Sequence, residues 1–301
     1  MRLPDFLIIG AAKSGTTTLY KYLCRHPQFY QPVKENTTYI PQKPYSYKEP
    51  NFFGCDQNYA KGIEYYATLF EGSQEHQVCG EASTDYTKYP LFPESAARIA
   101  QHLPTIKLIY IMRHPVERAY SYYVQLNRGA KFKETFEEHI HKTSVSLDSS
   151  NYMLQIQQYL KFFPKEAFLF LLMDDLIKQP ADTLRKVCNF IGIDDSIDLV
   201  PAEGLVANQA SRFFQDTNRS KITAPLRAIP GIYPVAALLP QAWRDGFYRL
   251  LKETAYGKRI EKEYLPPPMR PETRQMLLKR FAKPNQRLAE FLNRDLSHWS
   301  K

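Results

Sequence analysis

The chain has 301 residues, which is enough for one large domain or two small ones. Hydrophobic residues make up 44% and charged residues 24%, and these ordinary globular proportions exclude a disordered chain, a collagen-like repeat and a coiled coil. The 40 Lys and Arg residues exceed the 31 Asp and Glu residues by 9. We therefore expect an anionic partner, such as nucleic acid, a phosphate ester or an acidic lipid.

The first residues, MRLPDFLIIGAAKSG, contain an apolar run that is too short for a signal peptide. No segment approaches the roughly 20 apolar residues that cross a bilayer, so we expect a cytoplasmic protein with no membrane partner. The cysteines lie far apart and form no C-x-x-C pair, which predicts reduced structural thiols at Cys24, Cys55, Cys79 and Cys188.

Short apolar runs alternate with amphipathic stretches along the first two thirds of the chain. The apolar runs predict buried strands at 5–10, 77–81, 106–112 and 167–173. The amphipathic stretches predict helices at 16–25, 59–70, 94–102, 116–128, 152–163 and 181–191. Because parallel strands need long crossover connections, strands separated by helices predict an α/β fold with a helix-flanked parallel sheet.

The pattern weakens from Pro201 onward, where 201–214 and 222–240 show turns and broken apolar runs. Two further helices are predicted at 242–253 and 271–293. Between Arg244 and Lys283 there are 11 basic and 5 acidic residues, an excess typical of a solvated helix face but also suited to a segment that covers an anion. With no linker or repeat, we predict one domain, 1–301, with a basic helical C-terminal part from about 201 to 301.

The strongest motif is the strand, turn and helix in FLIIGAAKSGTTTLYKYL. Gly10 ends the strand and Gly15 permits a tight turn. A helix then begins whose first N–H groups lack internal partners, and these groups favour an anion. An ordinary capped helix is the alternative interpretation, but Lys13 favours a phosphate loop, which would bind through Lys13, Ser14, Gly15, Thr16, Thr17 and Thr18.

This loop differs from the Walker pattern of nucleoside triphosphatases. Its lysine lies two residues before the second glycine rather than directly after it. The strand IKLIYIM ends in Arg113, where such enzymes need a carboxylate that helps to hold magnesium. The site would neutralise phosphate directly, which predicts no metal and disfavours a kinase.

Two motifs, in the order in which they follow each other along the chain, resemble motifs of the sulfotransferases that use 3′-phosphoadenosine-5′-phosphosulfate (PAPS). AAKSGTTTL (11–19) is similar to their 5′-phosphosulfate loop, and IMRHPVERAYSYY (111–123) is similar to their 3′-phosphate motif. The resemblance implies the sulfotransferase fold, which is built on a P-loop-type parallel sheet, with PAPS as co-substrate and 3′-phosphoadenosine-5′-phosphate (PAP) as product. It also implies that Arg113 and Ser121 bind the 3′-phosphate and that Lys13 stabilises the departing phosphate.

A third match, 47–70, resembles the acceptor-side segment of the heparan sulfate N- and O-sulfotransferase branch. It implies that Glu49 is the general base, whereas a surface carboxylate paired with Lys48 is the alternative and Glu35 is a rival base. One departure is that Ala82 follows Glu81, where the heparan branch has Lys.

We therefore expect sulfuryl transfer from PAPS to a hydroxyl or amine of a small-molecule acceptor, a natural product or a sugar. The missing lysine argues against inferring a glycosaminoglycan, and the expected location favours secondary metabolism. The alternatives are a P-loop small-molecule kinase and a non-catalytic basic module that binds nucleic acid, although we expect no nucleic-acid partner. The oligomeric state is not predicted.

Overall fold

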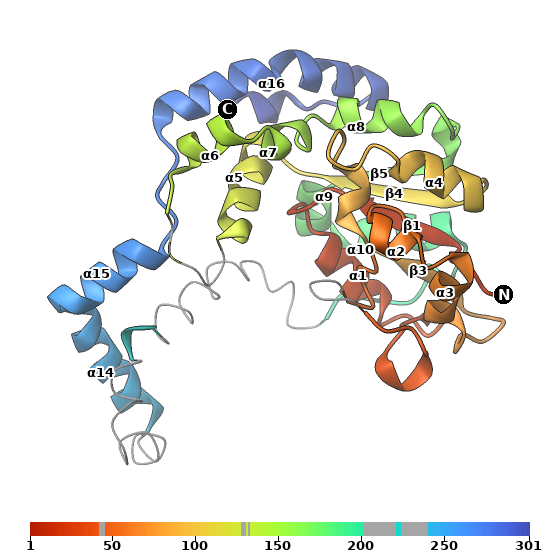
Figure 1. Ribbon diagram of the computed structural model, residues 1–301, viewed down its shortest axis with the longest axis horizontal. Helices are drawn as coiled ribbons and strands as arrows, with labels where there is room; N and C mark the ends of the chain where they lie inside the picture. Colours follow the sequence, from red (N-terminus) through yellow and green to blue (C-terminus); the bar gives the residue numbers. More distant parts are fainter. Residues whose placement is uncertain (42–45, 128–130, 132, 202–220, 224–239) are drawn as a thin grey trace. The chain divides into compact units, whose positions relative to one another are not determined.

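The computed structural model describes residues 1–41, 46–127, 131, 133–201, 221–223 and 240–301. Five strands form one sheet in the order β2-β3-β1-β4-β5, and each neighbouring pair is parallel (Figure 1). The predicted parallel sheet is confirmed. The strands are β1 (Phe6–Gly10), β2 (Phe29–Tyr30), β3 (Val78–Glu81), β4 (Lys107–Met112) and β5 (Phe168–Leu172). Only β2 was not predicted, because two residues form no recognisable apolar run.

Most predicted helices are present within two residues of the expected bounds, except that α8 ends four residues before the predicted end at 163. They are α1 (Thr16–Leu23), α4 (Ser95–His102), α5 (Pro115–Leu126), α8 (Tyr152–Tyr159), α10 (Pro180–Ile191), α14 (Gln241–Glu253) and α16 (Pro271–Leu292). The structure adds α6 (Phe136–Lys142), α7 (Val145–Asp148), α9 (Met173–Lys178), α15 (Ala255–Tyr264), η1 (Lys34–Asn36), η3 (Thr84–Thr87), η4 (Lys165–Ala167) and η5 (Ser297–Ser300).

The single helix predicted at 59–70 is wrong. The segment contains the end of α2 (Asp56–Tyr59), then α3 (Ile63–Ala67) and η2 (Thr68–Phe70). Gly62 separates α2 from α3 with a φ of 87°, a conformation that a continuous right-handed helix cannot contain.

Both faces of the sheet are covered, as the uninterrupted apolar runs require. Leu7 and Ile9 of β1 belong to the core cluster that includes buried side chains of α4, α8 and α16. The ring of Phe6 packs on Phe29, which in turn packs on Tyr20 of α1. Figure 1 shows α8 and α16 on one side of the sheet, with α1 and α10 on the other.

The chain divides into two compact units. One comprises Met1–Tyr122, Thr143–Gly204 and Pro271–Lys301, and the other comprises Tyr123–Lys142 and Leu205–Arg270. The turns predicted within 201–240 lie mostly outside the described residues, and a single domain over 1–301 stays a prediction. All the predicted site residues belong to the first unit.

The sheet order brings three connections together. Strand β1 lies between β3 and β4, so the carboxyl ends at Gly10, Glu81 and Met112 share one edge of the sheet. From β1 the chain continues to β2, at one edge of the sheet, whereas from β4 it continues to β5, at the opposite edge. Ligands of open α/β sheets bind where the chain reverses direction in this way.

Candidate functional site

The loop Ala11–Gly15 joins β1 to α1 and is the predicted phosphate loop. Its Ala11 N–H donates to the Ile111 carbonyl oxygen across 2.8 Å, which holds the loop against β4. Lys13 and Gly15 have φ angles of 70° and 96°, so the chain makes the tight turn at left-handed positions. Thr87 Oγ1 lies 2.0 Å from where a Cβ at Gly10 would stand, so only glycine fits at the strand end.

The loop ends in the positive end of a helix. The first helical bond runs from Leu19 N–H to the Gly15 carbonyl, which leaves the amides of Thr16, Thr17 and Thr18 without an acceptor inside the helix. The Ser14 hydroxyl is buried and lies close to Tyr152, but it makes no hydrogen bond among the described residues. A buried donor beside free helix amides fits an anion.

Arg113 follows β4 and reaches the phosphate loop. Its Nη1 donates to the Lys13 carbonyl oxygen across 3.5 Å, although the two residues are 100 positions apart. The Tyr152 hydroxyl holds the Arg113 backbone, since it donates to the carbonyl oxygen at 2.6 Å and accepts from the N–H at 3.1 Å. The structure therefore brings the two predicted motifs together.

Ser121 lies half-buried on α5. Among the described residues, no side-chain hydrogen bond joins Ser121 to Arg113. The next residue, Tyr122, accepts a hydrogen bond from Lys88 Nζ across 3.3 Å, which ties α5 to the segment after β3. Binding of one phosphate by Arg113 and Ser121 stays a prediction.

Arg118, also on α5, is completely buried and was not predicted. Its Nε donates to Ser150 Oγ across 2.6 Å, its Nη1 donates to the Ala12 carbonyl across 3.3 Å, and its Nη2 donates to the Ser146 carbonyl. Arg118 stands inside the quoted 111–123 motif, but an arginine in an amphipathic helix pattern gives no sign that it is buried.

The predicted base, Glu49, forms an ion pair with Lys48 and is 35% exposed. This pairing is the alternative that the sequence left open, and the catalytic role stays a prediction. The Lys48 backbone and side chain both contact Ala82. The Ala82 N–H donates to the Lys48 carbonyl across 2.8 Å, and Lys48 Nζ lies 3.5 Å from the Ala82 carbonyl oxygen. Lys48 thus places an ammonium group beside the position where the heparan branch has lysine.

The loop Lys48–Phe53, here called the Glu49 loop, is held against the segment that follows β3. Asn51 donates from its N–H to Ser83 Oγ and from its Nδ2 to Asp85 Oδ2, each across 2.9 Å. Phe53 N–H donates to the Tyr86 hydroxyl across 3.4 Å. These bonds place the Glu49 loop at the same sheet edge as the phosphate loop.

The segment Ala82–Lys88 is the common support of both loops. Beyond its contacts with the Glu49 loop, Thr87 Oγ1 donates to the Ile9 carbonyl across 2.8 Å, next to the start of the phosphate loop. Lys88 is nearly buried, and it pairs with Asp85 as well as contacting Tyr122. One segment therefore contacts the end of β1, the Glu49 loop and α5.

Glu81 ends β3 and is completely buried. The Tyr86 and Tyr66 hydroxyls donate to its Oε1 across 2.6 Å and 3.4 Å. Burial raises the pKa of Glu81 from 4.5 to about 7, against the opposing hydrogen bond from Tyr86, and the negative charge of Glu49 adds to the rise. The sequence feature that could have identified Glu81 is an acidic residue at the end of an apolar run, but the sequence does not show that this residue is buried.

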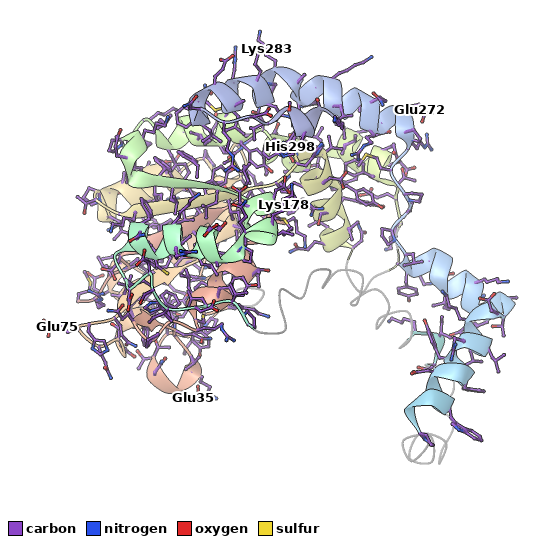
Figure 2. The ribbon with its side chains drawn as sticks, turned by 180° about the vertical axis from the view of Figure 1, so that it is seen from behind. Glu35, Glu75, Lys178, Glu272, Lys283 and His298 are labelled. Atoms are coloured by element: carbon purple, nitrogen blue, oxygen red, sulfur yellow. The ribbon has the colours of Figure 1, made fainter. Side chains whose placement is uncertain are left out.

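The rival base, Glu35, is exposed on η1. Figure 2 shows it at the outer end of a projecting loop, and among the described residues no side-chain hydrogen bond or ion pair joins it to the Glu49 loop. The contacts of the described residues thus connect Glu49, but not Glu35, to the segment after β3.

Three further observations concern the described residues. All four cysteines are free thiols, with Cys79 and Cys188 buried. In this part of the chain, no three His, Cys, Asp or Glu side chains gather as a metal site, and metal independence stays a prediction. None of the described helices is both long enough and apolar enough to pass through a lipid bilayer.

Comparison with known proteins follows this geometry. A family model described as "Sulfotransferase domain" matches residues 3–224. The chain is 31% identical over 208 residues to heparan sulfate glucosamine 3-O-sulfotransferase 5 of Mus musculus, covering 65% of this chain and 55% of that protein. It is 28% identical over 207 residues to the bifunctional heparan sulfate N-deacetylase/N-sulfotransferase 1 of Caenorhabditis elegans, covering 64% of this chain and 22% of that protein.

Among solved structures, a sulfotransferase from Alicyclobacillus acidocaldarius is similar over 100% of both chains, with a TM-score of 0.65 and 23% identity. This likeness supports the fold alone. The aligned segments span about half or less of the two curated relatives, so their whole activities do not transfer to this chain directly.

Proposed function

Because the chain belongs to the sulfotransferase family, we propose that it transfers a sulfuryl group from PAPS to a hydroxyl or amine of a small-molecule acceptor, a natural product or a sugar, and releases PAP. The observation that carries this proposal is the contact of Arg113 with the Lys13 backbone, at the sheet edge that also holds Glu49. Two cationic residues from separate motifs thus meet beside a buried hydroxyl and the free amides of a helix start.

The residues present fit a bisphosphorylated nucleotide. The Ser14 hydroxyl is buried without a partner in the described residues, and the amides of Thr16, Thr17 and Thr18 are available to an anion. With Lys13 and Gly15 they hold the 5′-phosphosulfate end, while Arg113 and Ser121 hold the 3′-phosphate. Bound PAPS supplies an activated sulfuryl group.

The chain contributes mostly position and charge to this reaction. Lys13 stabilises the negative charge that develops on the bridging oxygen and the departing phosphate. Glu49 removes the proton from the acceptor hydroxyl or amine, for which its partial exposure leaves it accessible. Lys48 lies between Glu49 and Ala82, so it orients the Glu49 carboxylate and takes the place of the lysine that position 82 lacks.

The finer parts of the proposal rest on the sequence. The cytoplasmic location and the place in secondary metabolism belong to this proposal, and Ala82 supports the choice of a small acceptor over a polysaccharide. The names of the two curated relatives refer to heparan sulfate, and this chain resembles that branch in the order of its motifs. A sugar acceptor therefore stays within the proposal.

A ligand screen by thermal shift tests the function against its two alternatives. PAP should raise the melting temperature in the absence of metal, because a ligand that binds only the folded state stabilises it. Stabilisation by ATP with Mg²⁺ alone would indicate a kinase. Stabilisation by oligonucleotides that weakens steeply with salt, without a response to PAP, would indicate a nucleic-acid-binding module.

A further inference from the structure

Arg118 is a buried cation without an opposite charge. Its side chain is 0% exposed, and its three hydrogen-bond acceptors are Ser150 Oγ and the carbonyls of Ala12 and Ser146, which are all neutral. No Asp or Glu of the described residues forms an ion pair with it. Buried charges in proteins are normally paired, so this arrangement requires a reason.

Among the described residues, the side chains that act most strongly on the Arg118 charge are three tyrosines and the cation Arg113, and none of them is a carboxylate. A guanidinium group stays protonated at any physiological pH. Burial lowers the pKa of Arg118, the nearby tyrosines Tyr152, Tyr110 and Tyr122 raise it, and the charge of Arg113 lowers it again. The Tyr122 ring lies 5.6 Å away and offers only the weak negative potential of its face. No carboxylate of the described residues therefore pairs with this positive charge behind the phosphate loop.

The contact with Ala12 connects this charge to the phosphate loop. Ala12 lies between Ala11, which is bonded to β4, and Lys13, whose carbonyl accepts from Arg113. Arg118 thus fixes the loop backbone at one point, and its field acts where an anion would bind.

Resting on the function proposed above, we propose that Arg118 is the buried counter-charge for the 5′-phosphate end of the nucleotide. It acts without touching the ligand, through the Ala12 carbonyl and through its electric field. It is a positioning residue, and its positive charge is balanced when the nucleotide binds. The competing interpretation is a neutral structural role, in which Arg118 only ties α5 to the Ser146–Ser150 turn.

The two roles differ in how they depend on the ligand. The experiment measures by calorimetry the binding of PAP, adenosine 5′-monophosphate and adenosine 3′-monophosphate to the wild-type chain, Arg118→Met and Arg118→Lys. We expect Arg118→Met to weaken the two 5′-phosphorylated ligands by about tenfold or more, because one charge within a partly buried site has an effect of this size. The 3′-monophosphate should change by less than about twofold, and Arg118→Lys, which keeps the charge, should retain most of the affinity.

Arg185→Met is the control, since it removes the same charge from an exposed position on α10. If Arg118→Met does not fold, Arg118→Gln and Arg118→Lys provide the same comparison. Equal weakening of all three ligands, no weakening at all, or loss in Arg118→Lys equal to that of the neutral variant would overturn the counter-charge role alone. Failure of the wild-type chain to bind any of these nucleotides would overturn the proposed function, and the Arg118 role with it.

Discussion

The Tyr86 hydroxyl donates a hydrogen bond of 2.6 Å to the buried carboxylate of Glu81. The hydroxyl oxygen of Tyr86 also accepts a hydrogen bond from Phe53 N–H, so this tyrosine joins β3 to the Glu49 loop. We expect Tyr86→Phe to lower the free energy of unfolding by about 1 to 3 kcal/mol, because a buried carboxylate loses its shortest donor. Chemical denaturation at pH 7 measures this change. Tyr47→Phe, in a partly exposed ring of the same region, is the control, and equal losses in both variants would contradict the prediction.

The raised pKa of Glu81 predicts a pH-dependent stability. Since its pKa is about 7 in the folded chain and 4.5 ordinarily, the folded state keeps this proton when the unfolded state has lost it. The contribution is full below about pH 4.5 and is lost as the pH rises through about 7. Denaturation curves should therefore show Glu81→Gln gaining on the order of 3 kcal/mol over the wild type between pH 4.5 and pH 8.

The matched control for that series is Glu75→Gln, because Glu75 is exposed at the outer surface (Figure 2). Its stability should run parallel to that of the wild type across the pH range. A difference between Glu81→Gln and the wild type that does not change with pH would mean that folding does not raise the pKa of Glu81.

PAP should bind tightly without a divalent metal. The motivation is that Arg113 follows β4 where a metal-holding carboxylate would otherwise stand, so the chain neutralises phosphate with its own cations. Calorimetry in excess EDTA, compared with the same titration in Mg²⁺, measures the effect. Abolition of PAP binding by the chelator would refute the metal-independent site.

Lys13→Ala and Arg113→Ala should have opposite effects on the kinetic constants, with kcat changed mainly by the first and KM mainly by the second. In the proposed mechanism Lys13 stabilises charge that develops during transfer, so its removal should lower kcat more than it raises KM for PAPS. In the same proposal Arg113 holds the 3′-phosphate equally before and during transfer, so its removal should mainly raise KM. Steady-state kinetics with varied PAPS separates the two constants. The same ratio of effects in both variants would be inconsistent with these roles.

Glu49→Gln should fold and bind PAP but lose transfer to a hydroxyl acceptor by about 10²- to 10⁴-fold, the usual contribution of a general base. The substitution keeps the size of the side chain and removes its proton-accepting carboxylate. Radiolabelled PAPS and a metabolite extract provide the assay, in which the labelled product identifies the acceptor.

Glu35→Gln is the control for that variant, because Glu35 also follows a lysine but lies exposed on η1, outside the Glu49 loop. Its activity should stay near that of the wild type. Loss of transfer in Glu35→Gln with full activity in Glu49→Gln would show that the acceptor-side alignment is wrong, while the cofactor side could still be correct.

The sequence by itself determined the parallel sheet and the phosphate loop. Buried parallel strands read as continuous apolar runs, so β1 and β4 could be placed from composition within a residue. The turn after β1 was also local, because Gly10 and Gly15 hold backbone positions that other residues resist. The position of Arg113 at the end of β4 was also local, and because parallel strands end at a common edge, that position lies beside the loop.

Only the tertiary structure decided which charges are buried and what they contact. In the sequence, Glu81 and Arg118 cannot be told apart from exposed Glu and Arg residues. Their burial depends on residues distant in the chain, such as Tyr66 for Glu81 and Ser146 for Arg118. The support of the Glu49 loop by Ser83 and Asp85 also joins residues more than 30 positions apart. Such contacts leave no periodic pattern, because a hydrogen bond across the fold depends on where two segments meet rather than on the neighbours of either residue.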